Sequence, residues 1–147
     1  MGLFVYFIMN KRMLDSRDAG YLRFQPVYMD GPAYGGLICT ATGLARFLQD
    51  MIRPTSQLFS SATRELFFTP QHTSDGKPSG MTLGWRVGNL NGEPYFGKAG
   101  GGPGFESNAR IYPQLGVGTV WLANHSGVNE RHIHELSDNL DLHWMER

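Results

Sequence analysis

The sequence predicts an α+β protein in which a helical region precedes an antiparallel sheet of three or more strands and a C-terminal helix. Two observations lead to this prediction. One apolar stripe at the helical period lies within residues 40–54, and short β-prone runs separated by turn residues fill the chain after Gly80. Because helices come first and strands follow, instead of alternating with them, the pattern favours α+β over a parallel α/β fold.

The first helix is predicted in "TATGLARFLQDMIRP". Thr40 or Thr42 can cap its start, and Pro54 stops it. Its apolar positions follow the spacing i, i+3, i+4, i+7 and i+8, and they are Leu44, Phe47, Leu48, Met51 and Ile52.

A second, shorter helix is predicted after Ser60 or Ser61, over "ATRELFF", ending before Pro70. The stretch "HTSDGKPSG" that follows is a polar, exposed loop. Residues 10–36 mix prolines and glycines with aromatic residues, and this composition indicates an irregular loop.

The sheet is predicted from four runs, "MTLGWRV", "PYFGK", "SNARIY" and "GVGTVWLAN". Turn residues separate them at Asn91-Gly92, at the Gly100–Gly104 cluster and at 113–116, which is typical of an antiparallel meander. A helix is then expected from about Asn129, with one apolar face formed by Ile133, Leu136, Leu140 and Trp144.

Size and charge limit the classes of function. We expect 147 residues to form a single domain, with a loop and helical region at 1–80 and the sheet and last helix at 81–147. Thirteen basic residues balance thirteen acidic ones, so no positive field exists to attract nucleic acid or an anionic membrane.

The apolar run Leu3–Met9 is far shorter than the roughly 20 residues of a membrane span. Its basic residues follow the run instead of preceding it, so it does not resemble a signal peptide, and the default expectation is a cytoplasmic protein. Cys39 stands alone, which excludes an intrachain disulfide, and its apolar neighbours predict a buried side chain.

The stretch "YFGKAGGGPGF" places a basic residue, Lys98, near the end of an apolar run and directly before a glycine-rich segment. Glycines let a ligand approach the backbone, exposed N–H groups can stabilise an oxyanion, and an ammonium can bind a carboxylate. The alternative is a glycine-rich turn between two strands.

The histidines give a weaker signal. His132 and His134 are two positions apart, so on a helix they point to different faces, and we expect no metal site and no cofactor. His125 follows a predicted strand, where it either lines a pocket or simply ends the strand.

The order of "GGLICTATGLARF" and "GKAGGGPGFESNARIYPQLGVGTVWLAN" resembles the C-terminal part of the serine β-lactamase-like superfamily, which contains class C β-lactamases, DD-peptidases and related esterases. The resemblance covers roughly residues 20 to 146. It implies that Lys98 supplies positive potential beside a nucleophile and that the Gly101 N–H forms half of an oxyanion hole. Ala99 stands where the family usually has Thr or Ser, which favours an ester over a β-lactam substrate. The residues assigned to substrate binding are Ala99, Gly100, Gly102, Phe105, Tyr34 and His125.

The family's nucleophile motif, Ser-x-x-Lys, has one match, Ser74 to Lys77, and it lies in the polar loop instead of at the start of a buried helix. Ser137-Asp138-Asn139 matches the family's Ser-x-Asn element but follows Lys98, which breaks the family order, and Tyr-x-Asn does not occur. We therefore expect a fragment without its nucleophile.

Three functions remain open. The chain is inactive alone, or a second polypeptide completes it as a serine acyl hydrolase, or it is a module that binds a small acyl, ester or peptide-like ligand. Because an open sheet edge invites pairing, we also expect a homodimer formed through that edge or through Leu3–Met9.

Overall fold

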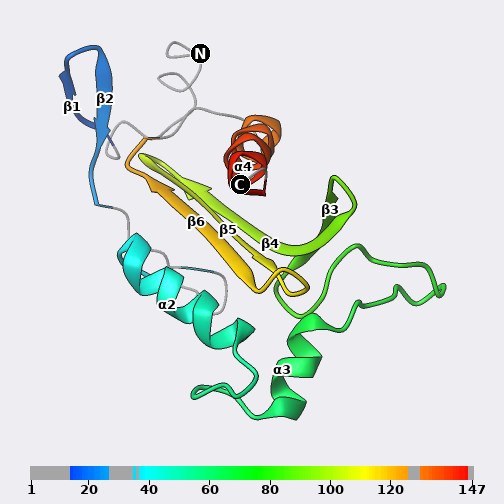
Figure 1. Ribbon diagram of the computed structural model, residues 1–147. Helices are drawn as coiled ribbons and strands as arrows, with labels where there is room; N and C mark the ends of the chain where they lie inside the picture. Colours follow the sequence, from blue (N-terminus) through cyan, green and yellow to red (C-terminus); the bar gives the residue numbers. More distant parts are fainter. Residues whose placement is uncertain (1–13, 27–34, 36, 126–129, 146–147) are drawn as a thin grey trace.

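A four-stranded antiparallel sheet is the centre of the computed structural model, which describes residues 14–26, 35, 37–125 and 130–145. The sheet has the order β3-β4-β5-β6, with β3 at Arg86–Leu90, β4 at Glu93–Gly102, β5 at Phe105–Tyr112 and β6 at Val117–Ala123. Helix α4 (Glu130–Met145) lies on one face and α2 (Ala41–Ile52) on the other, and α3 (Ser61–Phe68) follows α2 (Figure 1). The predicted α+β meander with a closing helix is confirmed.

The first two of the three turns that join the described strands of the meander are tight. Asn91 and Gly92 both have positive φ values, 51° and 91°, the backbone of a two-residue turn that matches the twist of a hairpin. The break predicted from Gly100 comes later, because β4 continues through Gly102 and only Pro103 and Gly104 form the turn. The glycines of "KAGGG" are therefore strand residues.

Helix α2 forms where the apolar stripe predicts it. The Thr40 hydroxyl caps its start by accepting a hydrogen bond from the Gly43 N–H at 3.1 Å. Leu48 and Met51 are buried against Ala109 and Ile111, which are positions of β5 that point to the same face of the sheet. The apolar core of the protein therefore lies between α2 and the sheet.

The connection from α2 to α3 is held by Asp50, a buried carboxylate. It accepts hydrogen bonds from the Ser56 hydroxyl and from the backbone N–H groups of Gln57, at 2.7 Å, and Leu58, at 3.3 Å. The Ser56 hydroxyl and the Gln57 N–H lower the pKa of Asp50 below its usual value. Ser60 then caps α3, the second predicted helix, by accepting from the Thr63 N–H at 3.1 Å.

The prediction of an irregular loop over residues 10–36 is wrong for its described first half. Strands β1 (Leu14–Asp18) and β2 (Tyr21–Phe24) form a hairpin beyond one end of the main sheet (Figure 1). Its turn places Ala19 and Gly20 at positive φ, 47° and 86°. The sequence lacks the Asn-Gly or Asp-Gly pair that usually marks such a turn, so the hairpin gave no clear signal.

The prediction that Cys39 is buried is also wrong, since its side chain is exposed. Its neighbours Leu37 and Ile38 are 98% and 97% exposed, so this segment passes outside the core that α2 forms. The segment Leu3–Met9 and Tyr34 lie outside the described residues.

Helix α4 begins where it is expected, but its apolar face is not the face that packs. Ile133 is buried, whereas Leu136, Leu140 and Trp144 are 47%, 42% and 62% exposed. The helix instead turns Ser137 and Asp141 toward the sheet, because the sheet face it covers carries polar residues.

Candidate functional site

The open edge of β4 is the feature that brings the predicted site residues together. Strand β3 pairs with β4 only from Glu93 to Gly97, where Gly97 lies opposite Arg86. From Lys98 to Gly102, the pairing partner of β4 is β5 alone among the described strands. An edge strand presents backbone N–H and C=O groups that another chain or a ligand can bind. Lys98 is the first residue of this edge.

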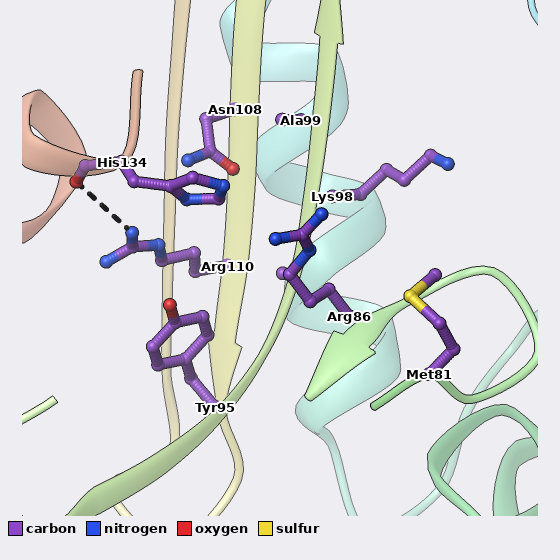
Figure 2. A pocket seen from close by; sticks show the side chains of 9 residues that line it. Met81, Arg86, Tyr95, Lys98, Ala99, Asn108, Arg110 and His134 are labelled. Atoms are coloured by element: carbon purple, nitrogen blue, oxygen red, sulfur yellow. Dashed lines mark hydrogen bonds between the residues drawn. The ribbon is translucent and has the colours of Figure 1, made fainter. Parts of the chain in front are cut away.

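The Lys98 side chain is exposed and lies on the α2 side of the sheet. Lys98 is opposite Ala109, and Ala109 is opposite Val120, so the three share one face, the face of the apolar core. Figure 2 shows the Lys98 side chain leaving β4 on the side away from Asn108 and Arg110. Its ammonium is therefore available to a ligand that approaches the edge from the α2 side.

The glycines after Lys98 differ in what they permit. A Cβ atom at Gly100 would come within 2.9 Å of the Ser107 Oγ, which donates a hydrogen bond to the Gly100 carbonyl at 3.2 Å. A Cβ atom at Gly101 would meet only ordinary contacts, the nearest at 3.5 Å. A side chain at 100 would therefore force the Ser107 hydroxyl to move, whereas one at 101 would not disturb its neighbours. A glycine at 101 leaves its exposed backbone open to a ligand.

The other predicted substrate-binding residues are spread over several places. Ala99 shares the α4 face with Gly101, so its side chain lies on the face opposite to that of Lys98. The exposed Phe105 packs its ring against Gly102, where a Cβ atom would come within 2.7 Å of it. His125 contacts Tyr21 of the hairpin, with ring centroids 5.7 Å apart and nearly perpendicular planes. The structure thus places Lys98, Gly100 and Gly102 on one face and Ala99 with Gly101 on the other.

The described residues contain no Ser-x-x-Lys arrangement on a helix. Lys77 and Lys98 are the two lysines of this part of the chain, one in a turn and the other on β4. Ser74 and Lys77 lie in an exposed loop, and the Lys77 ammonium pairs with Asp75 at 2.8 Å. This loop does not place Lys77 one helical turn after Ser74.

A buried polar network on the α4 side escaped the sequence prediction. The Arg110 Nη1 binds Asp138 at 2.7 Å and Asp141 at 3.0 Å, and the Tyr112 hydroxyl donates to Asp141 at 2.7 Å. Burial, followed by the hydrogen bond to Asp141, raises the pKa of Tyr112 above its usual value. The sequence does contain a pattern for this network. Residues 108, 110 and 112 are two positions apart, so they share one face of a strand, and Ser137 and Asp141 are one helical turn apart.

Ser137 is the second centre of that network, and all its hydrogen-bonding capacity is used. Its hydroxyl donates to the Ile133 carbonyl at 2.8 Å and accepts from Asn108 Nδ2 at 2.6 Å and Trp121 Nε1 at 2.9 Å. The predicted match of Ser137 to a Ser-x-Asn element therefore corresponds to a buried structural serine. It holds α4 on the sheet.

Within the described ranges, His, Cys, Asp and Glu form no group of three or more that could hold a metal ion. The helices of this part of the chain include none that is long and apolar enough to cross a membrane.

A comparison with protein-family models finds the family described as Beta-lactamase over residues 10–141. The match covers most of the chain, and the chain therefore belongs to the beta-lactamase family, in agreement with the resemblance of its motifs. A search of the curated proteins and a search of the solved structures each found no match. The family supports a protein of the serine-hydrolase type.

Proposed function

We propose that this chain supplies the substrate and oxyanion wall of a serine acyl hydrolase and that another polypeptide supplies the Ser-x-x-Lys nucleophile. The observation that carries the proposal is the open edge of β4, which begins at an exposed lysine and continues through three consecutive glycines. Because the chain belongs to the beta-lactamase family, which is of the serine-hydrolase type, we relate this edge to acyl transfer.

The edge offers two kinds of positive group to an acyl substrate. When a serine attacks an ester carbonyl, the carbonyl oxygen becomes an oxyanion, and a backbone N–H such as that of Gly101 can donate to it. The Lys98 ammonium adds positive potential on the α2 side of the strand. Ala99 provides no hydroxyl for a substrate carboxylate, so the proposed substrate is an ester instead of a β-lactam.

The attacking group has to come from outside the described residues. Acyl transfer needs a serine oxygen whose proton a nearby base removes as the bond to the carbonyl carbon forms. Ser107 is near the edge, but its hydroxyl is bound to the Gly100 carbonyl. Ser74 and Lys77 lack the helical arrangement, as described above.

The outer edge of β6 offers a docking place for such a polypeptide. Among the described strands β6 pairs only with β5, and Val117 and Leu122 on it are 43% and 40% exposed. An open edge with apolar side chains favours strand pairing with another chain. A second copy of this chain, as the sequence analysis expects, would compete for the same edge.

Complementation tests the proposal. This chain is mixed with a separately expressed polypeptide carrying the nucleophile helix of a beta-lactamase-family protein. Hydrolysis of p-nitrophenyl acetate and labelling by a fluorophosphonate probe are then measured. We expect slow hydrolysis by either polypeptide alone and a clear increase for the mixture, with the label on the added serine. Replacing Lys98 by Ala should lower kcat of the mixture about 100-fold, since one stabilising group is lost.

The matched control is Lys77→Ala, which removes the other described lysine from an exposed loop and should leave hydrolysis unchanged. Labelling of this chain alone would contradict the proposal, and mapping the label to Ser107 would assign the nucleophile to the chain itself. Saturable ester binding by the mixture without hydrolysis would instead favour the binding module.

A further inference from the structure

A pocket of about 110 Å³ lies at the open edge of β4, where Gly97 and Lys98 line it together with residues from the α4 side of the sheet. Strands β4 and β5 supply Tyr95, Ala99, Asn108 and Arg110 to its wall, and α4 supplies His134 (Figure 2). Met81 and Arg86 come from the segment before β4 and approach from the other side (Figure 2). The pocket shares Lys98 and Ala99 with the proposed acyl hydrolase site, but the proposed hydrolysis does not use the side of the pocket formed by Arg110 and His134.

Arg110 gives the pocket a buried donor. Its side chain is 1% exposed, and its Nη1 and Nη2 groups are occupied by Asp138, Asp141 and the His134 carbonyl, the last at 3.4 Å. The Nε–H of the same guanidinium has no hydrogen-bond acceptor within the described part of the chain. Buried N–H groups in folded proteins nearly always have an acceptor. The pocket beside Arg110 is where an acceptor from outside the protein can enter.

The charge and size of the lining define the acceptor. Arg86, Lys98 and Arg110 are cationic, and no carboxylate is among the described residues that line the pocket. Asp138 and Asp141 neutralise the Nη side of Arg110, so we expect the ligand to accept a hydrogen bond from the Nε–H. Met81, Tyr95 and Ala99 add apolar surface. A cavity that holds benzene measures about 150 Å³, so a pocket of about 110 Å³ accepts a smaller molecule.

We propose that this pocket binds a carboxylate that carries a short alkyl group. One carboxylate oxygen accepts the hydrogen bond of the Arg110 Nε–H, and the negative charge is attracted by Arg86. The alkyl group packs against Met81 and Tyr95. Such a carboxylate belongs either to a free acid of two or three carbons or to the C-terminus of a peptide.

The test is a titration of the ¹⁵N-labelled full chain followed by NMR. The Arg110 Nε–Hε resonance is the direct probe, and the Trp121 indole N–H, which binds Ser137, reports whether the α4 network is intact. Sodium acetate should shift the Arg110 resonance saturably, whereas acetamide, of the same shape without the charge, should shift it at least tenfold less. Ala99→Leu should abolish the shift by filling the pocket, and Ala62→Leu, on an exposed position of α3, should not.

A second pair of variants makes the result independent of pocket filling. Arg86→Gln should weaken acetate binding about two- to fivefold, as expected for an exposed ion pair, and Arg17→Gln on β1 should have no effect. If the Trp121 resonance shows that Ala99→Leu has disrupted the network, the Arg86 pair decides.

The outcomes distinguish the sources and can overturn the proposal. Tighter binding of acetate than of a peptide ending in Gly-Gly assigns the site to a free acid, and the reverse assigns it to a chain terminus. The absence of a saturable shift with either ligand, an equal shift with acetamide, or binding insensitive to Arg86→Gln would each overturn it. Lys98 lines both this pocket and the proposed acyl hydrolase edge, so acetate binding is measured on this chain alone, and its failure leaves hydrolysis by the mixture as a separate result.

Discussion

The two faces of the main sheet are held to their helices by different kinds of interaction. On the α2 face, Leu48 and Met51 pack against Ala109 and Ile111, and aromatic rings extend this contact, such as Phe68 with Phe96 at a centroid distance of 4.9 Å. On the α4 face, ion pairs and hydrogen bonds to buried polar groups make the connection. Shortening a buried apolar side chain lowers the free energy of unfolding gradually, with the number of atoms removed. Removing one partner of a buried ion pair lowers it strongly, because the other charge stays buried alone. The faces should therefore respond differently to substitution.

The largest effect is expected from Arg110→Met. The substitution keeps most of the side-chain volume but leaves Asp141, which is 2% exposed, without its cation. Breaking a buried ion pair in this way costs about 3–5 kcal/mol. Urea denaturation, followed by far-UV circular dichroism, should show a fall of this size in the free energy of unfolding.

The double variant Arg110→Met/Asp141→Leu is the control, because it removes both charges. It should regain much of the loss, since an apolar pair of similar volume can replace a buried ion pair at little cost. If the single variant lost no more than Arg17→Met at an exposed position, the ion pair would be solvated and the contrast between the faces would fail.

On the apolar face, Leu48→Ala should cost about 2–5 kcal/mol, the usual range for a buried leucine. Leu48 is 1% exposed, and its Cβ lies 3.0 Å from where a Cβ of Gly118 would be, so α2 sits close to β6. Because the backbones of α2 and β6 are already close here, the helix cannot move far to fill the cavity that Leu48→Ala leaves. We therefore expect the loss in the free energy of unfolding to lie in the upper half of that range.

Leu66→Ala on α3 is the matched control, since Leu66 is 55% exposed and its loss should stay within about 0.5 kcal/mol. Equal losses for the two leucine variants would mean that α2 is not the main cover of this face. The measurement is again the free energy of unfolding in urea.

The comparison of the faces also explains what the sequence could predict. Helix α2 and the meander were predictable because the apolar period and the turn residues are local signals, and Asn91-Gly92 is the strongest of them. The packed face of α4 was not, because its orientation depends on Asn108, Arg110 and Tyr112, three polar residues that the fold places under it. The side chains that a helix buries are those that match the surface on which it packs, and the surface under α4 is polar.

The candidate site divides in the same way. Lys98 and the glycines were found from their order in one stretch of sequence. The open edge depends on β3 ending its pairing at Gly97, which is a matter of strand length and register. The carboxylate pocket combines residues from three strands and a helix, and no local motif contains them. Side chains that meet only through tertiary packing leave no pattern within a short window.

The smallest effect is expected from Leu140→Gln, on the apolar face of α4 that points away from the sheet. Leu140 is 42% exposed, so the change in the free energy of unfolding should stay within about 0.5 kcal/mol. Ile133→Ala is the matched variant, since Ile133 is 8% exposed and lies on the same helix, and it should cost about 2–5 kcal/mol. This pair tests directly whether α4 packs through Ile133, Ser137 and Asp141.

A loss above about 2 kcal/mol for Leu140→Gln would contradict this orientation for the isolated chain, because surface substitutions rarely cost as much. Repeating the unfolding experiment at several protein concentrations then separates two causes. A loss that is independent of concentration means that the chain itself covers Leu140. A loss that grows with concentration means that a second copy covers it, since the stability of a dimer depends on protomer concentration. In that case the dimer interface would consist of Leu136, Leu140 and Trp144, and it would not lie at the open edge of β6.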